Sequence, residues 1–303
     1  MDGCLEKAGS QSVFMRDPEI VESSKYDKGA SWMFWFTDQF ASEEDRRVVQ
    51  LRIKLDAFYA SPGEYSAFLE ANWKPEYWDP IKQRALTHIT KTGRCRILEI
   101  GAGCTSFGSY LGELRDRVEF HAQDVTPANQ GYLATQADAV HIADVLSIRD
   151  KYDVIFSTFT WEHVSGPKRT LKHLTTLLNP GGSIFIASPR YDFPFYLSPS
   201  ARHLTRARKT AIAIWLLWRR VRVLLGGRAD FLIHLDPAVL RSRWFRDADA
   251  IHWVSLWDLK SEFSEGHEIR RIRIPAKGVL GRFWEKYLLL FVMITPRIGN
   301  PVV

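Results

Sequence analysis

Two glycines that follow a short apolar run are the residues whose types and spacing most directly indicate chemistry. The run 96–100 has the pattern of an interior strand, and it carries one carboxylate, Glu99. Gly101 and Gly103 follow, with Ala102 between them. Because glycine lacks a β-carbon, a ligand can approach this backbone closely and the chain can turn sharply into a helix. An unpaired buried carboxylate is costly, so we expect a ligand or a ring of donors beside Glu99.

Polar side chains recur where the next apolar runs end. Asp124, Asp144 and the pair Ser157 and Thr158 each stand at the end of such a run. In an open parallel sheet, ligands bind at the carboxyl ends of the strands, near the point where the strand order reverses. The two acids could bond a ribose diol and an exocyclic amine, although each alone is equally typical of a helix cap. Their joint placement favours a nucleotide-like ligand.

The elements that must position these residues form an alternating pattern from residue 94 onward. Helices are expected at 166–178 and 257–265, and a turn at 179–182. Such alternation predicts an α/β fold with a mostly parallel sheet and helices on both faces. The expected strands span 96–100, 118–122, 139–142, 152–156, 183–187, 268–274 and 288–294.

The segments on either side differ in character from this alternating core. Helices are expected from Ser42, around Tyr65 and over 79–89, and the aromatic cluster 32–36 is expected to pack on the domain. Residues 191–250 interrupt the alternation and are interpreted as an insertion. The predicted organisation is a tail at 1–40, a helical lid at 41–93, a core at 94–190, an acceptor-side insertion at 191–250 and completion of the core sheet at 251–303.

Composition excludes several classes of protein. The chain has 303 residues and a net charge of 41 − 35 = +6, without a zinc-finger spacing or a long basic tract, so we expect no nucleic-acid partner. The cysteines at 4, 95 and 104 have neither disulfide nor metal spacing, which fits a reducing compartment. There is no signal-peptide pattern and no run of the ~18 apolar residues that would span a bilayer. We therefore expect a cytoplasmic protein.

Residues 96–190 resemble class I S-adenosylmethionine-dependent methyltransferases of the small-molecule and ubiquinone type. The resemblance implies a Rossmann-like sheet of seven strands, which the strands at 268–274 and 288–294 would complete. One departure is Thr105, which stands where the common pattern has a third glycine. The stretches that carry the resemblance are Leu98-Glu-Ile-Gly-Ala-Gly103, Tyr152-Asp-Val-Ile-Phe156, Trp161-Glu-His-Val164 and Leu177-Leu-Asn-Pro-Gly-Gly-Ser-Ile-Phe-Ile186.

The resemblance also implies a set of cofactor-binding residues for S-adenosyl-L-methionine. The backbone of 101–103 would hold the methionine part, with Glu99 supporting that region. Asp124 would take the ribose hydroxyls. The remaining implied contacts are Asp144 and Val145 with the adenine, and Ser157 and Thr158 near the sulfonium.

His163 is the first candidate for a general base, because its ordinary pKa suits neutral pH. A structural hydrogen-bonding role for His163 is an equal alternative. Further candidates are Tyr191, Asp192 and His203, in that order. Some family members with a Glu-His pair at this place bind a metal through an acid at the position that Phe159 occupies here, so no metal is expected.

The insertion suggests what the acceptor side contacts. The stretch 189–196 is rich in aromatic residues, which suit sugars and other amphipathic acceptors but also plain packing. The segment 206–225 is apolar over 211–218 and flanked by Arg and Lys, so it could lie on an anionic membrane surface, act as a lid or form a dimer contact. The stretch 247–254 resembles methyltransferases of bacterial surface-glycan pathways, which implies a glycan acceptor.

Taken together, the sequence predicts methyl transfer from S-adenosylmethionine to a small molecule or glycan, at oxygen. One alternative is a catalytically idle methyltransferase fold that serves as a binding module. A nucleotide-dependent dehydrogenase is disfavoured because Ser106 stands where its fingerprint has glycine. Methylation of nucleic-acid bases is disfavoured because 157–160 lacks an Asn-Pro-Pro-Tyr-like stretch.

Overall fold

The computed structural model describes residues 73–201, 204–227, 229, 231–234 and 249–297, together with 35–37, Ile53 and Leu55. Ile53 and Leu55 are helical, in agreement with the helix expected from Ser42. The remainder of that helix, the helix around Tyr65, most of the tail and the candidate base His203 lie outside the described residues.

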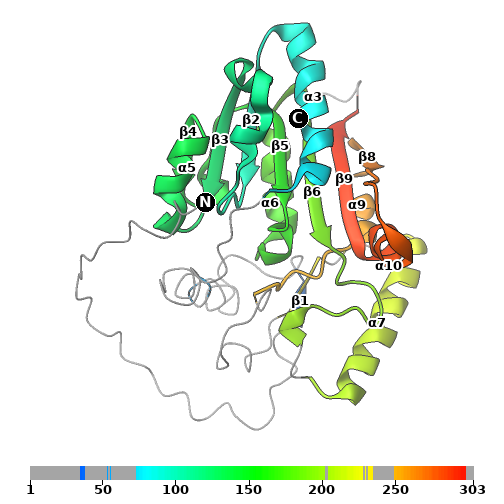
Figure 1. Ribbon diagram of the computed structural model, residues 1–303. Helices are drawn as coiled ribbons and strands as arrows, with labels where there is room; N and C mark the ends of the chain where they lie inside the picture. The colour runs from blue at the N-terminus through cyan, green and yellow to red at the C-terminus, as the bar shows by residue number, and fades with distance from the viewer. Residues whose placement is uncertain are drawn as a thin grey trace, which may run out of the picture.

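A seven-stranded sheet forms the centre of the described structure (Figure 1). Its strand order is β4-β3-β2-β5-β6-β9-β8, and β9 runs antiparallel to both of its neighbours while β2 to β6 are parallel. The Rossmann-like prediction is therefore confirmed. The strands are β2 (Cys95–Ile100), β3 (Val118–Asp124), β4 (Ala139–Ile142), β5 (Tyr152–Thr158), β6 (Leu178–Pro189), β8 (His267–Arg271) and β9 (Leu289–Pro296).

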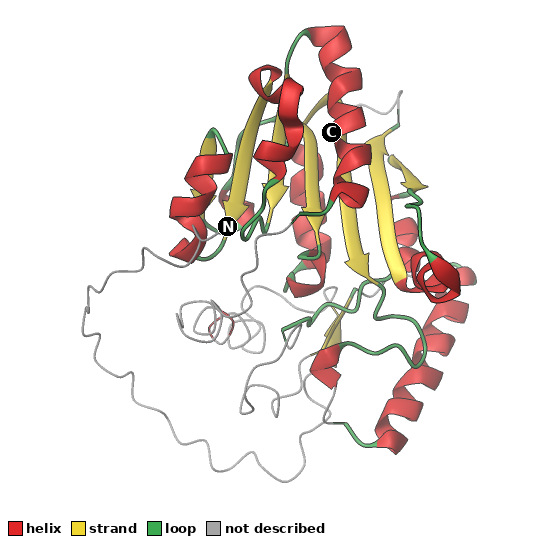
Figure 2. Ribbon diagram, viewed as in Figure 1, coloured by secondary structure: helices red, strands yellow, loops and turns green. Residues whose placement is uncertain are grey.

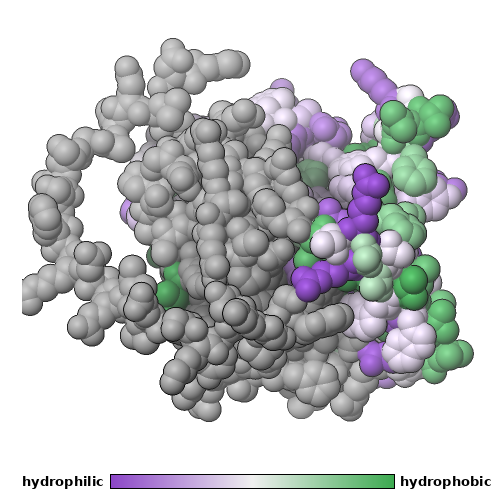
Figure 3. Space-filling view, turned by 90° about the horizontal axis from the view of Figure 1, so that it is seen from below, coloured by the Kyte–Doolittle hydropathy of each residue, from purple (hydrophilic) through white to green (hydrophobic). Residues whose placement is uncertain are grey.

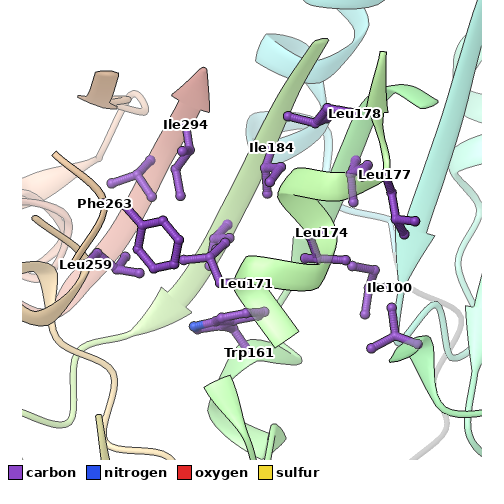
Figure 4. Packing of buried hydrophobic residues seen from close by; sticks show 14 of the residues in the cluster. Ile100, Trp161, Leu171, Leu174, Leu177, Leu178, Ile184, Leu259, Phe263 and Ile294 are labelled. Atoms are coloured by element: carbon purple, nitrogen blue, oxygen red, sulfur yellow. The ribbon is translucent and has the colours of Figure 1, made fainter. Parts of the chain in front are cut away.

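Helices cover both faces of this sheet (Figure 2). Successive side chains of β2 point to opposite faces, so Ile97 packs beneath α3 while Leu98 packs toward α6. Figure 4 shows the second face, where Leu171 of α6 and Phe263 of α9 pack against strand residues such as Ile184. The helices are α3 (Pro75–Thr92), α4 (Phe107–Leu111) and α5 (Gln130–Gln136) on one face, and α6 (Pro167–Thr176) and α9 (Leu256–Phe263) on the other.

Helix α3 belongs to the core of the domain. Its buried residues Trp78, Ile81, Ala85 and Ile89 recur at intervals of three and four, which places them on one helix face. Gly93 ends the helix with a left-handed φ of 88°, and its backbone N–H donates to the carbonyl of Ile89. This part of segment 41–93 thus packs on the sheet, and a lid role for the rest of the segment stays a prediction.

Strand β6 is longer than expected. The sequence predicted a turn at 179–182, but these residues lie within the strand. The register explains the difference: Tyr152 pairs with Leu178 and Val154 with Ser183, so β6 carries extra residues as a bulge opposite β5. Proline and glycine therefore mark an irregularity in the strand here, and the turn prediction was wrong.

The insertion contributes a long helix and a small sheet. Helix α7 spans Arg206–Leu224, and β7 (Leu232–His234) pairs antiparallel with β1 (Trp35–Thr37). The strand β1 overlaps the aromatic cluster at 32–36, where no strand was expected. Short apolar strands of this kind are stabilised by their pairing partner, which a local sequence pattern does not show. Helix α10 (Gly278–Phe283) and a π-helical turn (Trp284–Leu288) also precede β9 and were not expected.

Candidate functional site

The site lies at the carboxyl ends of β2 and β5, between which the strand order reverses. Gly101 has a left-handed φ of 62°, and its carbonyl accepts a hydrogen bond of 3.0 Å from the Thr160 hydroxyl. A β-carbon on Gly101 would lie only 2.0 Å from Cγ2 of Thr160, so no side chain fits there. Gly103 also has a left-handed φ, of 56°, but a β-carbon on it would meet nothing within 4 Å. The first glycine is thus required by close packing, and the second leaves the backbone open to a ligand.

The glycine loop is held by the end of the neighbouring strand β3. The N–H groups of Gly101 and Gly103 donate to Gln123 Oε1 at 3.1 Å and to Asp124 Oδ2 at 2.8 Å. Between them, the Ala102 N–H donates to the carbonyl of Gln123 at 2.9 Å. Oδ1 of Asp124 accepts a bond of 3.1 Å from the Thr126 N–H, which fixes the plane of the carboxyl group. Sequence reasoning assigned no role to Gln123, although an amide directly before the strand-end acid was the available signal.

Glu99 supplies a buried carboxyl group near the end of β2, two residues before Gly101. It is 2% exposed, and its Oε2 atom has no hydrogen-bond partner in the structure. Burial raises the pKa of Glu99 to about 8, while hydrogen bonds from Thr105 and Thr158 act in the opposite direction. The buried hydroxyl of Ser157 also lacks a partner. Two orphaned buried polar atoms at the strand ends fit a ligand that brings its own donors and acceptors.

Asp124 shares this environment. It is 4% exposed, and burial raises its pKa, while hydrogen bonds from the backbone of Thr126 and Gly103 act in the opposite direction. Its carboxyl group is therefore positioned by backbone donors at the end of a parallel strand. This arrangement fits the binding of a vicinal diol, since a fixed carboxylate can accept two parallel hydrogen bonds.

Asp144 and Val145 lie at the end of β4. Oδ1 of the exposed Asp144 accepts a bond of 2.9 Å from the Leu146 N–H and caps a short 3-10 turn. Val145 is buried in the core cluster beside this turn. The structure thus shows the capping role for Asp144, and contact with an adenine ring is a proposal.

His163 forms a pair with an acid that sequence reasoning missed. Its Nδ1 atom lies 3.1 Å from Oδ2 of Asp249, and both side chains are largely buried, at 18% and 11% exposed. Asp249 stands at the end of the insertion, 86 positions along the chain (249 − 163), so no local motif joins the two. Nδ1 of His163 therefore faces a carboxylate at short distance, an arrangement that can orient the ring.

Backbone contacts hold the two halves of this pair together. The N–H of His252 donates to the carbonyl of Glu162 at 2.8 Å, and Nδ1 of His252 lies 3.1 Å from the carbonyl of Trp161. The carboxyl of Glu162 in turn accepts a bond of 2.9 Å from the Ser188 hydroxyl of β6. The turn 161–163 is therefore fastened both to the core sheet and to the end of the insertion.

The other candidate bases have different surroundings. Tyr191 is 3% exposed, stacks on Tyr196 with 5.5 Å between ring centroids, and belongs to the apolar cluster of the insertion. Asp192 lies 3.4 Å from the guanidinium groups of both Arg190 and Arg220. Asp192 is thus engaged by two cations, and Tyr191 is packed within the insertion.

A family model described as "Methyltransferase domain" matches residues 69–264, which is more than half of the chain. The chain belongs to this methyltransferase family. The expectation of a class I S-adenosylmethionine-dependent methyltransferase is confirmed by that membership together with the fold. No curated protein matches the methyltransferase at a significant level.

Solved structures resemble the methyltransferase in fold. At the identities found, the likeness concerns the fold alone. One is the plantazolicin methyltransferase BpumL in complex with SAH, at 12% identity and a TM-score of 0.46, with 83% of this chain and 98% of that chain covered. Another is the N-methyltransferase NodS from Bradyrhizobium japonicum WM9 in complex with S-adenosyl-l-homocysteine, at 12% identity and a TM-score of 0.42, with 82% of this chain and 97% of that chain covered. A third is the 1,6-didemethyltoxoflavin-N1-methyltransferase from Burkholderia thailandensis, at 11% identity and a TM-score of 0.48, with 82% of this chain and 89% of that chain covered.

One group of metal-ligating side chains lies elsewhere in the methyltransferase. Ligand atoms of His121, His141 and Asp150 lie within 4.8 Å of one another. However, the Arg96 guanidinium is 3.4 Å from both His121 Nε2 and Asp150 Oδ1, and its positive charge opposes a bound cation. We assign this group a structural role in joining β3 and β4 to the loop before β5.

Proposed function

We propose that this chain transfers the methyl group of S-adenosylmethionine to an oxygen atom of a small-molecule or glycan acceptor. The observation that carries the proposal is the glycine loop fixed on Gln123 and Asp124, together with the orphaned carboxyl oxygen of Glu99. Membership of the methyltransferase family supports methyl transfer, whereas the oxygen atom and the acceptor class are our own proposal. The bound donor supplies an electrophilic methyl group on a sulfonium centre.

The chain's own residues would hold the donor at the strand ends. Glu99 and the open backbone at Gly103 suit the amino-acid part, which carries donors and acceptors close together. Asp124 suits the ribose hydroxyls, since backbone donors hold its carboxyl group in place. The remaining contacts proposed are the adenine with Asp144 and Val145, and the region of the sulfonium with Ser157 and Thr158.

His163 is the proposed general base for the acceptor hydroxyl. Asp249 lies beside Nδ1, where it would orient the ring and stabilise the positive charge that His163 gains when it takes the acceptor's proton. Alignment of the nucleophile with the methyl carbon can lower the activation free energy by ~7–11 kcal/mol. The base therefore adds to the effect of positioning and does not replace it. Tyr191 is the second candidate, as a hydroxyl that contacts the acceptor from the insertion side.

A glycan acceptor is supported by the aromatic residues that follow β6. Tyr191 and Tyr196 stack on each other, and Phe195 in the same stretch is 74% exposed. Aromatic faces suit the apolar faces of sugar rings, as they suit flat small molecules. A panel of both acceptor classes is therefore the appropriate screen.

The donor site is tested by calorimetric titration with S-adenosylhomocysteine, with NAD as the control ligand. We expect binding of the former alone. Asp124→Asn should weaken that binding by about tenfold or more, because a charge-assisted hydrogen bond to the ribose is lost. The matched control is Asp116→Asn at an exposed acid away from the strand ends, which should bind like the wild type. Equal affinity of Asp124→Asn and wild type would remove Asp124 from the site, and binding of NAD would favour a dehydrogenase.

The base is tested once an acceptor is found. His163→Gln should lower kcat by about 10²-fold or more while leaving the affinity for S-adenosylhomocysteine unchanged. Asp249→Asn should have a smaller effect on kcat and displace the pH-rate profile, since Asp249 acts through His163. If both variants retain wild-type kcat at every pH, positioning alone accounts for catalysis and the base is rejected.

A further inference from the structure

Helix α7 exposes large apolar side chains along one side. Ile214, Trp218, Val221 and Leu225 stand at intervals of four, three and four, which places them in one stripe. In the space-filling view, apolar side chains gather on the part of this face not covered by grey atoms, with hydrophilic ones among them (Figure 3). The exposed fractions are Ile214 61%, Leu217 47%, Trp218 61%, Val221 52%, Leu224 61% and Leu225 82%.

The opposite side of α7 is anchored in the protein. Ala213, Leu216 and Arg219 are buried, and the Arg219 guanidinium lies 3.3 Å from the Asp258 carboxylate of α9. The side chains of both partners are at most 6% exposed. The helix orientation is therefore determined by a buried ion pair, and the apolar stripe is held toward solvent.

Helix α10 and the π-helical turn after it add a second exposed apolar group. Phe193 links this group to α7, because its ring lies 6.4 Å from that of Tyr287 and 5.4 Å from the Arg220 guanidinium. Figure 1 shows α10 beside one end of α7. The exposed fractions here are Val279 74%, Leu280 84%, Phe283 46% and Tyr287 38%.

The charges on these two segments have one sign. Residues 204–227 contain no Asp or Glu, and within 275–288 the single acid, Glu285, is buried beside Arg271. Within these two described segments, the charged side chains near the exposed apolar residues are therefore cations. The cations of the two segments are Arg206, Arg208, Lys209, Arg219, Arg220, Arg222, Lys277, Arg282 and Lys286, of which Arg219 pairs with Asp258 and Arg220 with Asp192.

We propose that this α7–α10 surface binds the face of an anionic lipid bilayer, with the apolar stripe at the level of the headgroups. Exposed Trp and Leu beside cations match the apolar interior and the negative surface of such a membrane. A second copy of the same surface would bring cation against cation, which disfavours self-association. Among the described residues no helix is long and apolar enough to cross a bilayer, so the contact is a parallel one. The inference rests on this surface and not on methyl transfer.

The proposal is tested by sedimentation of the full chain with two kinds of vesicle, phosphatidylcholine alone and phosphatidylcholine mixed with phosphatidylglycerol. We expect association with the mixed vesicles that is about tenfold stronger than with the neutral ones and that weakens with salt. Equal association with both kinds of vesicle, or association with neither, would overturn the proposal.

Variants localise the contact. Trp218→Glu on α7 and Leu280→Glu on α10 should each reduce binding to mixed vesicles by about tenfold. Leu86→Glu, on the exposed side of α3 at 39% exposed, is the matched control and should bind like the wild type. Titration with S-adenosylhomocysteine in each variant separates this surface from the donor site, since all three should bind it normally.

A different occupant would give a different set of results. One such set is a wild type that is a dimer in sedimentation equilibrium, a Trp218→Glu variant that is a monomer, and no binding to either kind of vesicle. In that case the surface joins two copies of the chain and the proposal is wrong. If Trp218→Glu and Leu280→Glu both bind mixed vesicles as the wild type does, the lipid contact lies elsewhere and the proposal is wrong.

Discussion

Replacement of Gly101 by alanine should destabilise the protein far more than the same change at Gly103. Both glycines have a left-handed φ, of 62° and 56°, which costs an alanine about 1–2 kcal/mol. Only at position 101 does the new β-carbon also collide, 2.0 Å from Cγ2 and 2.7 Å from Cβ of Thr160. Overpacking of this kind costs about 1–3 kcal/mol. We therefore expect losses of about 2–5 kcal/mol for Gly101→Ala and about 1–2 kcal/mol for Gly103→Ala.

The assay is urea unfolding followed by circular dichroism, with the free energy of unfolding compared between the two variants. Gly103→Ala is the matched control, since it has the backbone penalty without the collision. Addition of Thr160→Ser to Gly101→Ala removes Cγ2 but keeps the hydroxyl that donates to the Gly101 carbonyl, so it should recover part of the loss. Equal free energies for the two single variants, or no recovery in the double variant, would refute the close contact between the glycine loop and Thr160.

Two further predictions concern buried charges. The pKa of Glu99 is about 8 in the folded chain against an ordinary value of 4.5, so unfolding between these pH values releases a proton. The free energy of unfolding of the wild type should therefore fall, relative to Glu99→Gln, by up to ~1.4 kcal/mol per pH unit between about pH 4.5 and 8. Parallel pH profiles of urea unfolding for the two proteins would contradict this. Asp258→Asn leaves the buried Arg219 guanidinium beside a neutral amide and should lower the free energy of unfolding by about 3 kcal/mol. Lys172→Gln, at the more exposed pair with Glu262, should lower it by less than about 1 kcal/mol. Equal losses for the two variants in thermal unfolding would show that burial of the first pair has no energetic effect.

Much of the core could be predicted because its signals are local. The largely apolar runs that become β2 and β5 are buried on both faces, which an interior strand of a parallel sheet requires. The placement of Asp124 at a strand end follows from the same pattern. In the structure this acid accepts a hydrogen bond from the glycine loop, so the local pattern was sufficient to find an acid in contact with that loop.

The features that sequence reasoning missed depend on contacts between distant segments. Asp249 reaches His163 only because the chain returns from the insertion at that point, and a lone acid in a loop has no distinguishing pattern. The proline and glycines at 179–182 have the composition of a turn, and only the pairing of Tyr152 with Leu178 shows that they form a bulge. Likewise β1 exists through its pairing with β7, a partner nearly two hundred positions away (232 − 37 = 195).

The hydrogen bond from His252 to Glu162 has a consequence for how this domain can be varied. The segment between Arg190 and Asp249 is held by a hydrogen bond at each end. At the start, the N–H of Arg190 donates to the carbonyl of Leu288, and shortly after the end, the N–H of His252 donates to the carbonyl of Glu162. A transplanted segment whose ends match these two anchors should therefore leave the core sheet intact. On the proposed role of the insertion, exchange of acceptor preference between related enzymes would require an incoming segment that ends in an acid at position 249, because that acid forms half of the pair with His163.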